Sequence, residues 1–97
     1  MSENSKFEIK YTSSFKTDLK SFKNDITALN EIKSVINDLA NDKKLDAKFK
    51  DHSLIGNNKD KRECHIRPDL LLIYKKLDDL LVLVCIRVGS HAKLFKG

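Results

Sequence analysis

Residues 61–88, KRECHIRPDLLLIYKKLDDLLVLVCIRV, are the stretch of sequence that decides the fold. They contain three runs rich in aliphatic and β-branched residues, 61–67, 70–76 and 80–88, and such runs are typical of strands. Pro68-Asp69 and Leu77-Asp78-Asp79 separate the runs, and linkers of these lengths suit antiparallel turns. The sequence therefore predicts a three-stranded antiparallel meander in the second half of the chain.

The segment before this meander indicates one more strand and a first helix. Residues 7–11 (FEIKY) alternate apolar and polar side chains with a period of two, as in a half-buried strand. Residues 12–14 (TSS) are all able to cap the N-terminus of a helix. Phe15, Leu19 and Phe22 then recur at intervals of four and three residues, which places them on one helical face.

A second amphipathic helix is expected after a cap at Asn24 or Asp25. Its apolar positions keep helical spacing until the polar segment 41–44 (NDKK), and they are Ile26, Leu29, Ile32, Ile36 and Leu39. Residues 45–60 lose this periodicity and are expected to form a loop. At the other end of the chain, Ser90 can cap a single helical turn over residues 91–95.

These elements together predict an α+β fold in one domain of residues 1–97. The expected order is an N-terminal strand, an α-helical hairpin, a three-stranded antiparallel meander and a short C-terminal helical turn. Because a helix hairpin and a sheet bury their apolar faces against each other, the hairpin should cover one face of the sheet and leave the other open.

The composition restricts the class of function. The chain has 19 Lys and Arg residues against 14 Asp and Glu residues, for a net charge of +5. This charge favours a polyanionic partner, either nucleic acid or an acidic protein, although it also serves solubility. Residues 1–6 lack an apolar run that could act as a signal peptide, and the apolar run 80–86 is too short to span a bilayer. We therefore expect a cytoplasmic protein with no membrane partner.

The predicted open face of the sheet is rich in ionisable groups. On the strand 61–67, alternation sends Cys64 and Ile66 to one side. The side chains sent to the other side are Glu63, His65 and Arg67. All 3 histidines of the chain, His52, His65 and His91, fall in its second half. Because a histidine changes its charge near neutral pH, a converging group of them is a candidate acid–base site.

Three blocks carry most of these residues: KDHSL (50–54), RECHIRPD (62–69) followed by LIY (72–74), and RVGSHAKLF (87–95). These blocks resemble the signature segments of YafQ-type toxins, which belong to the RelE/ParE superfamily. They provide a histidine, then His-x-x-x-Asp, then Gly-Ser-His-x-x-x-Phe at matching intervals. The resemblance covers almost the whole chain in the order of its elements.

The resemblance implies an mRNA endonuclease that acts on the ribosome, inhibits translation and is held inactive by a cognate antitoxin, with a toxin–antitoxin heterotetramer as one possible assembly. By motif position, the functional residues of the family fall on His52, His65, Asp69, His91 and Phe95. Glu63 and Arg87 occupy neighbouring positions that are often polar or basic. Two positions depart from some relatives: Leu70 replaces an aromatic residue, and Glu63 replaces an aspartate.

The chemistry of RNA cleavage without a cofactor or metal needs a base for the 2′-hydroxyl proton, cationic groups for the phosphate and an acid for the departing 5′-oxygen. The predicted catalytic residues are His52, Glu63, His65, Asp69, Arg87 and His91. His91 is assigned as the acid, His52 or Asp69 as the base, and His65 and Arg87 as phosphate ligands.

The predicted substrate-binding residues are Lys50, Lys61, Arg62, Arg67 and Phe95. Phe95 can either stack on a base or anchor the C-terminal tail to the sheet. The position of Arg87 is less clear, because strict alternation from Leu83 through Cys85 places it on the apolar side of its strand unless it lies at an exposed strand end.

Three other functions remain open. A metal site built from His52, His65 and His91 is chemically possible, but no HxxxH or HExxH spacing supports it. The two cysteines, Cys64 and Cys85, also lack the CxxC spacing of a metal site, and they are expected to be buried small hydrophobic residues. A binding-only nucleic-acid module would explain the charge but not the histidines, and a ParE-like gyrase inhibitor would share the fold without needing a histidine-rich site.

Overall fold

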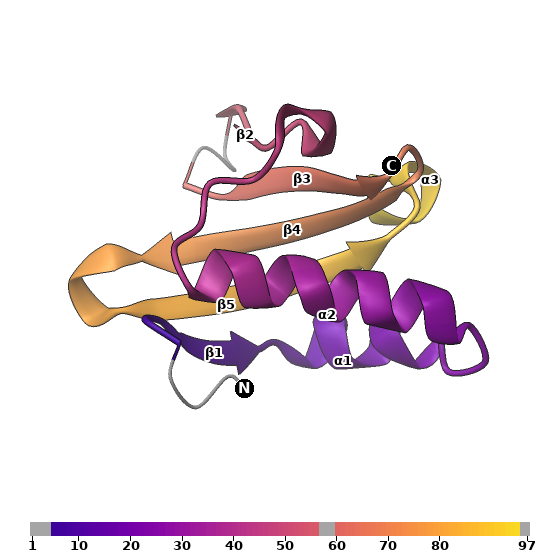
Figure 1. Cartoon of the computed structure of the whole chain (residues 1–97). Coiled ribbons are helices and arrows are strands. Elements are labelled where there is room, and N and C mark those ends of the chain that lie inside the picture. The colour runs from indigo at the N-terminus through magenta and orange to yellow at the C-terminus, as the bar shows by residue number, and fades with distance from the viewer. Residues whose placement is uncertain (1–4, 57–59, 96–97) are drawn as a thin grey trace.

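The computed structural model describes residues 5–56 and 60–95 and confirms the α+β fold (Figure 1). In chain order its elements are β1 (Glu8–Tyr11), α1 (Ser13–Lys20), α2 (Ile26–Ala40), the short 3₁₀ helix η2 (Ala47–Phe49), β2 (His52–Ser53), β3 (Arg62–Arg67), β4 (Leu70–Leu77), the 3₁₀ helix η4 (Asp78–Leu80), β5 (Val82–Gly89) and α3 (His91–Leu94).

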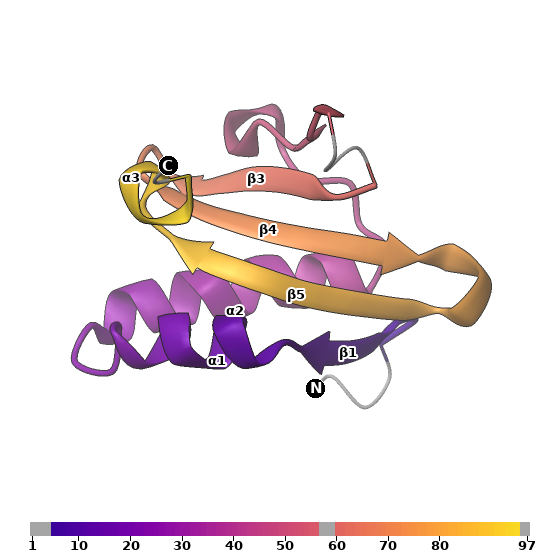
Figure 2. The same cartoon turned by 180° about the vertical axis from the view of Figure 1, so that it is seen from behind.

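The strands form one five-stranded sheet in the order β1-β5-β4-β3-β2. Strands β2 to β5 pair antiparallel with their neighbours, and β1 pairs parallel with β5. Helix α2 packs across one face of the sheet, while α1 follows β1 along the edge of β5 (Figure 1). On the opposite face, the only helix within the described residues is α3, which lies at the end of β5 (Figure 2).

The helix starts follow the predicted caps. The Thr12 side chain accepts from the backbone N–H of Phe15, and the Asp25 side chain accepts from that of Ala28. Ser90 caps α3 in the same way through Lys93. Each of these side chains satisfies an N–H that the first helical turn leaves without a backbone partner. The predicted apolar face of α2 is wrong at Ile26, which is 64% exposed because it lies in the first turn, beyond the sheet contact.

Several strand boundaries differ from the prediction by one or two residues, and one short strand was not predicted. The expected loop 45–60 contains η2 and the two-residue strand β2, which pairs with β3. Strand β5 begins at Val82 and not at Leu80, because Leu80 ends η4 and Leu81 has a positive φ of 53°. Leu80 and Leu81 thus belong to the turn between β4 and β5, although their apolar side chains are typical of a strand. Strand β3 begins at Arg62, and β4 extends to Leu77.

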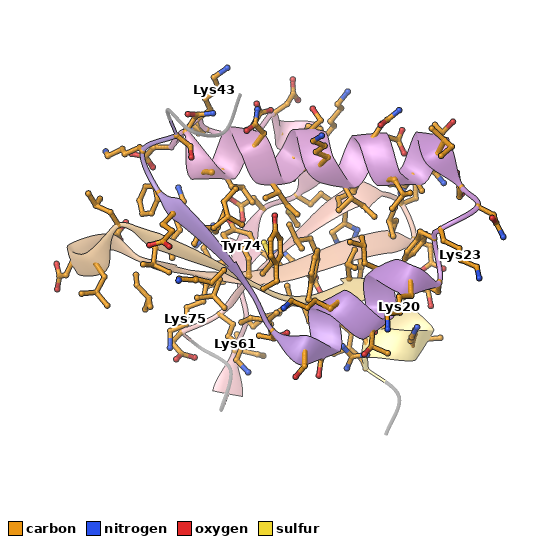
Figure 3. All side chains as sticks on the ribbon, turned by 90° about the horizontal axis from the view of Figure 1, so that it is seen from below. Lys20, Lys23, Lys43, Lys61, Tyr74 and Lys75 are labelled. Carbon is orange, nitrogen blue, oxygen red and sulfur yellow. The ribbon has the colours of Figure 1, made fainter. Side chains whose placement is uncertain are left out.

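The core lies between α2 and the sheet. Tyr74 points from β4 toward α2 (Figure 3) and is fully buried, together with Leu72 of the same strand. Cys64 and Cys85 are also fully buried in this core, as predicted. Burial raises the pKa of both thiols to about 12, so these cysteines act as small hydrophobic residues and not as nucleophiles.

From an ion-pair cluster at Asp42 we predict that part of the folding stability is lost in acid. Lys76 and Lys6 each place Nζ 2.9 Å from the Asp42 carboxylate, and their hydrogen bonds lower the pKa of Asp42 to about 2. A pKa below the unfolded value stabilises the fold above about pH 4, and this contribution is lost as the pH falls toward 2. We expect Asp42→Asn to lower the melting temperature slightly at about pH 6, and the difference from wild type to vanish near pH 2. A difference that stays constant across a pH series of thermal melts would contradict this.

Candidate active site

A carboxylate lies between two imidazoles on the open face of the sheet. Glu63 Oε1 is 3.3 Å from His52 Nε2 and 3.6 Å from His65 Nε2. The ring centroids of the two histidines are 6.4 Å apart. Glu63 is only 6% exposed, whereas both histidines reach solvent. The structure therefore brings together two of the three histidines that the sequence analysis expected to converge, with Glu63 between them.

The pairing of β2 with β3 brings His52 to this position. His52 is the direct cross-strand partner of Glu63, and His65 lies two residues further along β3 on the same face. Lys50 adopts a left-handed conformation with φ 49° before β2, and its carbonyl oxygen lies 2.7 Å from His52 Nδ1. An oxygen atom thus faces each ring nitrogen of His52, which fixes the plane of the ring and gives each nitrogen a proton acceptor.

A hydrogen-bond network on the helix side of the sheet holds the same segment. Tyr74 Oη donates to Asp51 Oδ1 over 2.6 Å, and Arg62 Nε donates to the same oxygen over 3.2 Å. Arg62 Nη1 also donates to Ser53 Oγ. Burial and the hydrogen bond to Asp51 raise the pKa of Tyr74. Because successive strand residues face opposite ways, anchoring Asp51 on the helix side turns His52 to the open side.

This network places Arg62, one of the predicted substrate-binding residues, in a structural role. Its side chain shares the helix side of the sheet with Tyr74, its cross-strand partner. The sequence analysis singled out His52 but missed the contribution of Asp51 and Tyr74. The signal available was their presence in the same motif blocks, at positions 51 and 74.

A β-bulge in β5 determines where Arg87 points. Ile73 pairs with Arg87, but Tyr74 pairs with Cys85, so Ile86 is an extra residue on β5. The strict alternation considered for this strand is therefore wrong, and Arg87 leaves the apolar side that Cys85 occupies. Its guanidinium donates from Nε to Asp18 Oδ2 over 2.6 Å and from Nη2 to Asp18 Oδ1 over 3.1 Å.

A second bulge, in β3, moves Arg67 away from the predicted face. The β3–β4 register shifts between His65 and Arg67, and Arg67 pairs with the core residue Leu70. Its guanidinium forms ion pairs with Glu31 of α2 and with the α2 cap Asp25. The prediction that Arg67 shares a face with Glu63 and His65 is therefore wrong, because the extra residue reverses the alternation.

Asp69 and His91 meet through the backbone. The Asp69 carboxylate accepts a hydrogen bond from the backbone N–H of His91 over 3.0 Å, which ties the β3–β4 turn to the start of α3. The His91 and Phe95 rings lie one helical turn apart, with centroids 5.0 Å from each other. Phe95 is 40% exposed, so part of its ring reaches solvent and part is covered. Stacking on a base and anchoring of the tail both stay open as its role.

Strand β4 separates two groups of candidate residues. His52, Glu63 and His65 lie on the β3 side, and Arg87 lies on the β5 side. Cross-strand rows run from Glu63 through Ile73 to Arg87, and from His65 through Leu71 to Gly89. Neighbouring strands are about 4.8 Å apart, so the outer members of each row are separated by about 10 Å across the sheet. The buried side chains of Leu71 and Ile73 form the floor between them.

Basic residues border this area. A groove of about 520 Å³ between α2 and η2 is lined by Lys50, His65 and Arg67, together with Phe49. Lys61, just before β3, projects from the side of the sheet that faces away from α2 (Figure 3). Within residues 5–56 and 60–95, no group of three or more His, Cys, Asp or Glu side chains is arranged to hold a metal ion.

Asp18 is the functional candidate that the sequence analysis missed. It lies between Phe15 and Leu19, on the apolar side of α1, and is only 2% exposed. A carboxylate at such a position is unusual unless it is paired, because a buried charge is costly without a partner. That helical position was the available signal, but its partner Arg87 is 69 residues away in the chain and could not be identified from spacing.

Comparison with known proteins places these features in a family. A family model described as "Bacterial toxin of type II toxin-antitoxin system, YafQ" matches residues 7–96. The chain belongs to this YafQ toxin family. It is 37% identical over 89 residues to the mRNA interferase toxin YafQ of Escherichia coli (strain K12), which covers 91% of this chain and 95% of that protein.

Solved structures of bacterial toxins share the fold. The toxin in the E. coli DinJ-YafQ toxin-antitoxin complex superposes with a TM-score of 0.82 at 35% identity, covering 93% of this chain and 98% of that chain. A metal-bound toxin from Helicobacter pylori gives a TM-score of 0.84 at 39% identity, covering 92% and 99%. The two E. coli relatives carry the name YafQ, which favours this branch over the ParE-like alternative. No helix among the described residues has the length and apolar character needed to cross a bilayer.

Proposed function

We propose that this protein is the toxin of a type II toxin–antitoxin system and inhibits translation as an mRNA interferase, cleaving mRNA on the ribosome by acid–base catalysis without a metal ion. The observation that carries the proposal is the Glu63 carboxylate between His52 and His65, in a cross-strand row that continues through Ile73 to Arg87. Family membership supports it, because the E. coli relative carries the name mRNA interferase toxin.

The proposed reaction begins with neutral His52, whose Nδ1–H donates to the Lys50 carbonyl oxygen and whose Nε2 takes the proton from the 2′-hydroxyl of the scissile nucleotide. Glu63 fixes the ring of His52 and accepts from its protonated form. The 2′-oxygen then attacks phosphorus, and the bond from phosphorus to the 5′-oxygen breaks. His91 gives its proton to that oxygen, which leaves a 2′,3′-cyclic phosphate and a 5′-hydroxyl.

The remaining residues bind and orient the substrate in this proposal. Arg87 and His65 donate to the phosphate oxygens as negative charge develops on them. Asp69 positions His91 through the backbone of α3 and is not itself the base. Phe95 stacks on a base, a contact worth about 1–3 kcal/mol. Lys50 and Lys61 attract the flanking phosphates, while Arg62 and Arg67 maintain the surrounding structure.

The proposed partner is a cognate antitoxin, as DinJ is for YafQ in the E. coli complex. A toxin–antitoxin heterotetramer is the assembly that we propose for the inactive state. We also propose that residues 1–97 form a single domain that acts in the cytoplasm, where translating ribosomes are found.

The function is tested by induced expression in a bacterial host, followed by mapping of mRNA 5′ ends. We expect new ends inside translated reading frames with the wild-type protein and none with His65→Ala, because that variant loses one phosphate ligand and half of the histidine pair. A reporter without a start codon serves as the untranslated control and should stay intact. DNA breaks without new mRNA ends would contradict the proposal and favour a gyrase inhibitor.

A further inference from the structure

We infer that Asp18 of α1 is a positioning residue for cleavage, which orients Arg87 on β5 and Lys93 on α3 toward the scissile phosphate. The inference rests on the proposed nuclease function and extends it to an element that carries none of the motif residues. Asp18 does not face the substrate in this account, and it acts through the two cations that it holds.

The contacts of Asp18 converge on a single buried carboxylate. Arg87 donates to both of its oxygens, and the backbone N–H of Val88 donates to Oδ2 over 3.1 Å. Lys93 Nζ lies 3.7 Å from Oδ1. A two-point contact between a guanidinium and a carboxylate fixes the plane as well as the position of the guanidinium. Asp18 therefore sets the direction in which the remaining N–H groups of Arg87 point.

The charged groups around Asp18 leave positive charge that can bind the substrate. Burial alone would raise the pKa of Asp18, but the hydrogen bonds from Arg87 and Val88 and the positive charges of Arg87 and Lys93 outweigh it and lower the pKa. The carboxylate thus stays ionised and balances one of the two cations. The Arg87 side chain is 33% exposed, and its guanidinium has five N–H donors, of which Asp18 uses two. Donors and one net positive charge remain for a phosphate.

Helix α1 also holds the backbone bulge that aims Arg87. Strand β1 pairs with β5 only from Val82 to Cys85, and α1 takes over the edge of β5 beyond that point. The Thr12 hydroxyl, which caps α1, donates to the carbonyl oxygen of Ile86 over 2.7 Å. Asp18 then accepts from Val88. The extra residue Ile86 is therefore held between two contacts from the same helix.

Lys93 extends the link to the proposed general acid. Lys93 belongs to α3, the helix that begins at His91 and is tied to Asp69 at its first residue. By contacting both Arg87 and Lys93, Asp18 couples the phosphate ligand on β5 to the helix that carries His91. A displaced carboxylate would change both groups together.

The test compares Asp18→Asn with Asp79→Asn by single-turnover cleavage of mRNA on ribosomes at a series of toxin concentrations. Asp79 lies in the β4–β5 turn, at the far end of the sheet from α3 (Figure 2), and its change alters the net charge equally. We expect Asp18→Asn to lower the maximal rate by about 10–100-fold with little change in the half-saturating concentration, since misplaced catalytic groups cost rates of this order. Asp79→Asn should match wild type within threefold.

A mutant cycle separates positioning from a general effect on folding. If Asp18 acts through Arg87 and Lys93, adding Asp18→Asn to an Arg87→Ala/Lys93→Ala variant should lower the rate by less than about threefold, because both groups to be oriented are already gone. Independent losses that multiply in the triple variant would overturn the inference. If Asp18→Asn does not fold, Asp18→Glu keeps the charge and displaces the carboxylate, and it should show the same loss of maximal rate.

The two proposals fail in different ways. A wild-type protein that leaves mRNA intact on the ribosome would overturn the nuclease function and, with it, the role of Asp18. A wild-type protein that cleaves, together with Asp18→Asn or Asp18→Glu variants that cleave within threefold of it, would overturn the positioning role alone.

Discussion

Replacing His91 with alanine should slow single-turnover cleavage of mRNA on a programmed ribosome by about 10²–10⁴-fold, the usual contribution of one general acid. The departing 5′-oxygen would have to leave without a proton, which is the costly step in breaking its bond to phosphorus. The position of His91 supports this role, because Asp69 holds its backbone and Phe95 lies beside its ring. The rate is measured by quenched-flow with wild type and variant at saturating toxin, in the presence of a chelator.

A modified substrate identifies the step that His91 assists. If the bridging 5′-oxygen is replaced by sulfur, the leaving group no longer needs a proton. We expect His91→Ala to cleave this substrate at nearly the wild-type rate, whereas Arg87→Ala should stay slow because it loses a phosphate ligand. Activity of His91→Ala within threefold of wild type on the unmodified mRNA would contradict the assignment, as would a failure of the sulfur substrate to restore the rate.

The long, regular elements of this fold are predictable from local patterns. The helical spacing of Ile32, Ile36 and Leu39 predicted α2, and the capping residues at 12–14 and 24–25 predicted both helix starts to within one or two residues, because each signal is contained within a few residues. Strand β2 was not predictable in this way. It has only two residues, His52 and Ser53, and exists because β3 provides its hydrogen-bond partners.

The two bulges explain why the face of a strand residue was harder to predict than the strand itself. The extra residues at Ile66 and Ile86 change neither the composition nor the length of a run noticeably, yet each reverses the alternation that follows. Arg67 was assigned to the wrong face for this reason, and the orientation of Arg87 could not be decided. Both bulges depend on partners elsewhere in the fold.

The residues of the candidate site also differ in whether the sequence alone could predict their contacts. Glu63 and His65 lie on one strand, so alternation was sufficient to place them on one face, whereas His52 joins them only through the pairing of β2 with β3. Asp18 required knowledge of a contact across most of the chain, and its role comes from packing α1 against the end of β5. A buried carboxylate on an apolar helix face marks such a position, but only the folded structure identifies its partner.

The central claim is that histidines of this site make the 2′-hydroxyl of mRNA the nucleophile. Removing the 2′-oxygen of the scissile nucleotide tests this claim. Attack by a nucleophile held in place is favoured by effective molarities of about 10⁵–10⁸ M. Removing the 2′-hydroxyl should therefore abolish nearly all cleavage at that bond. The matched control is a 2′-deoxy substitution three nucleotides away, which should leave the rate unchanged.

The measurement is single-turnover cleavage, with chelator present, of an mRNA on the ribosome that carries one 2′-deoxy nucleotide at the scissile position. We predict that cleavage at that bond falls by at least about 10³-fold, while unmodified mRNA yields a 2′,3′-cyclic phosphate. Cleavage of the 2′-deoxy bond within about tenfold of the unmodified rate would contradict the mechanism, because the attacking group would then be water or another nucleophile.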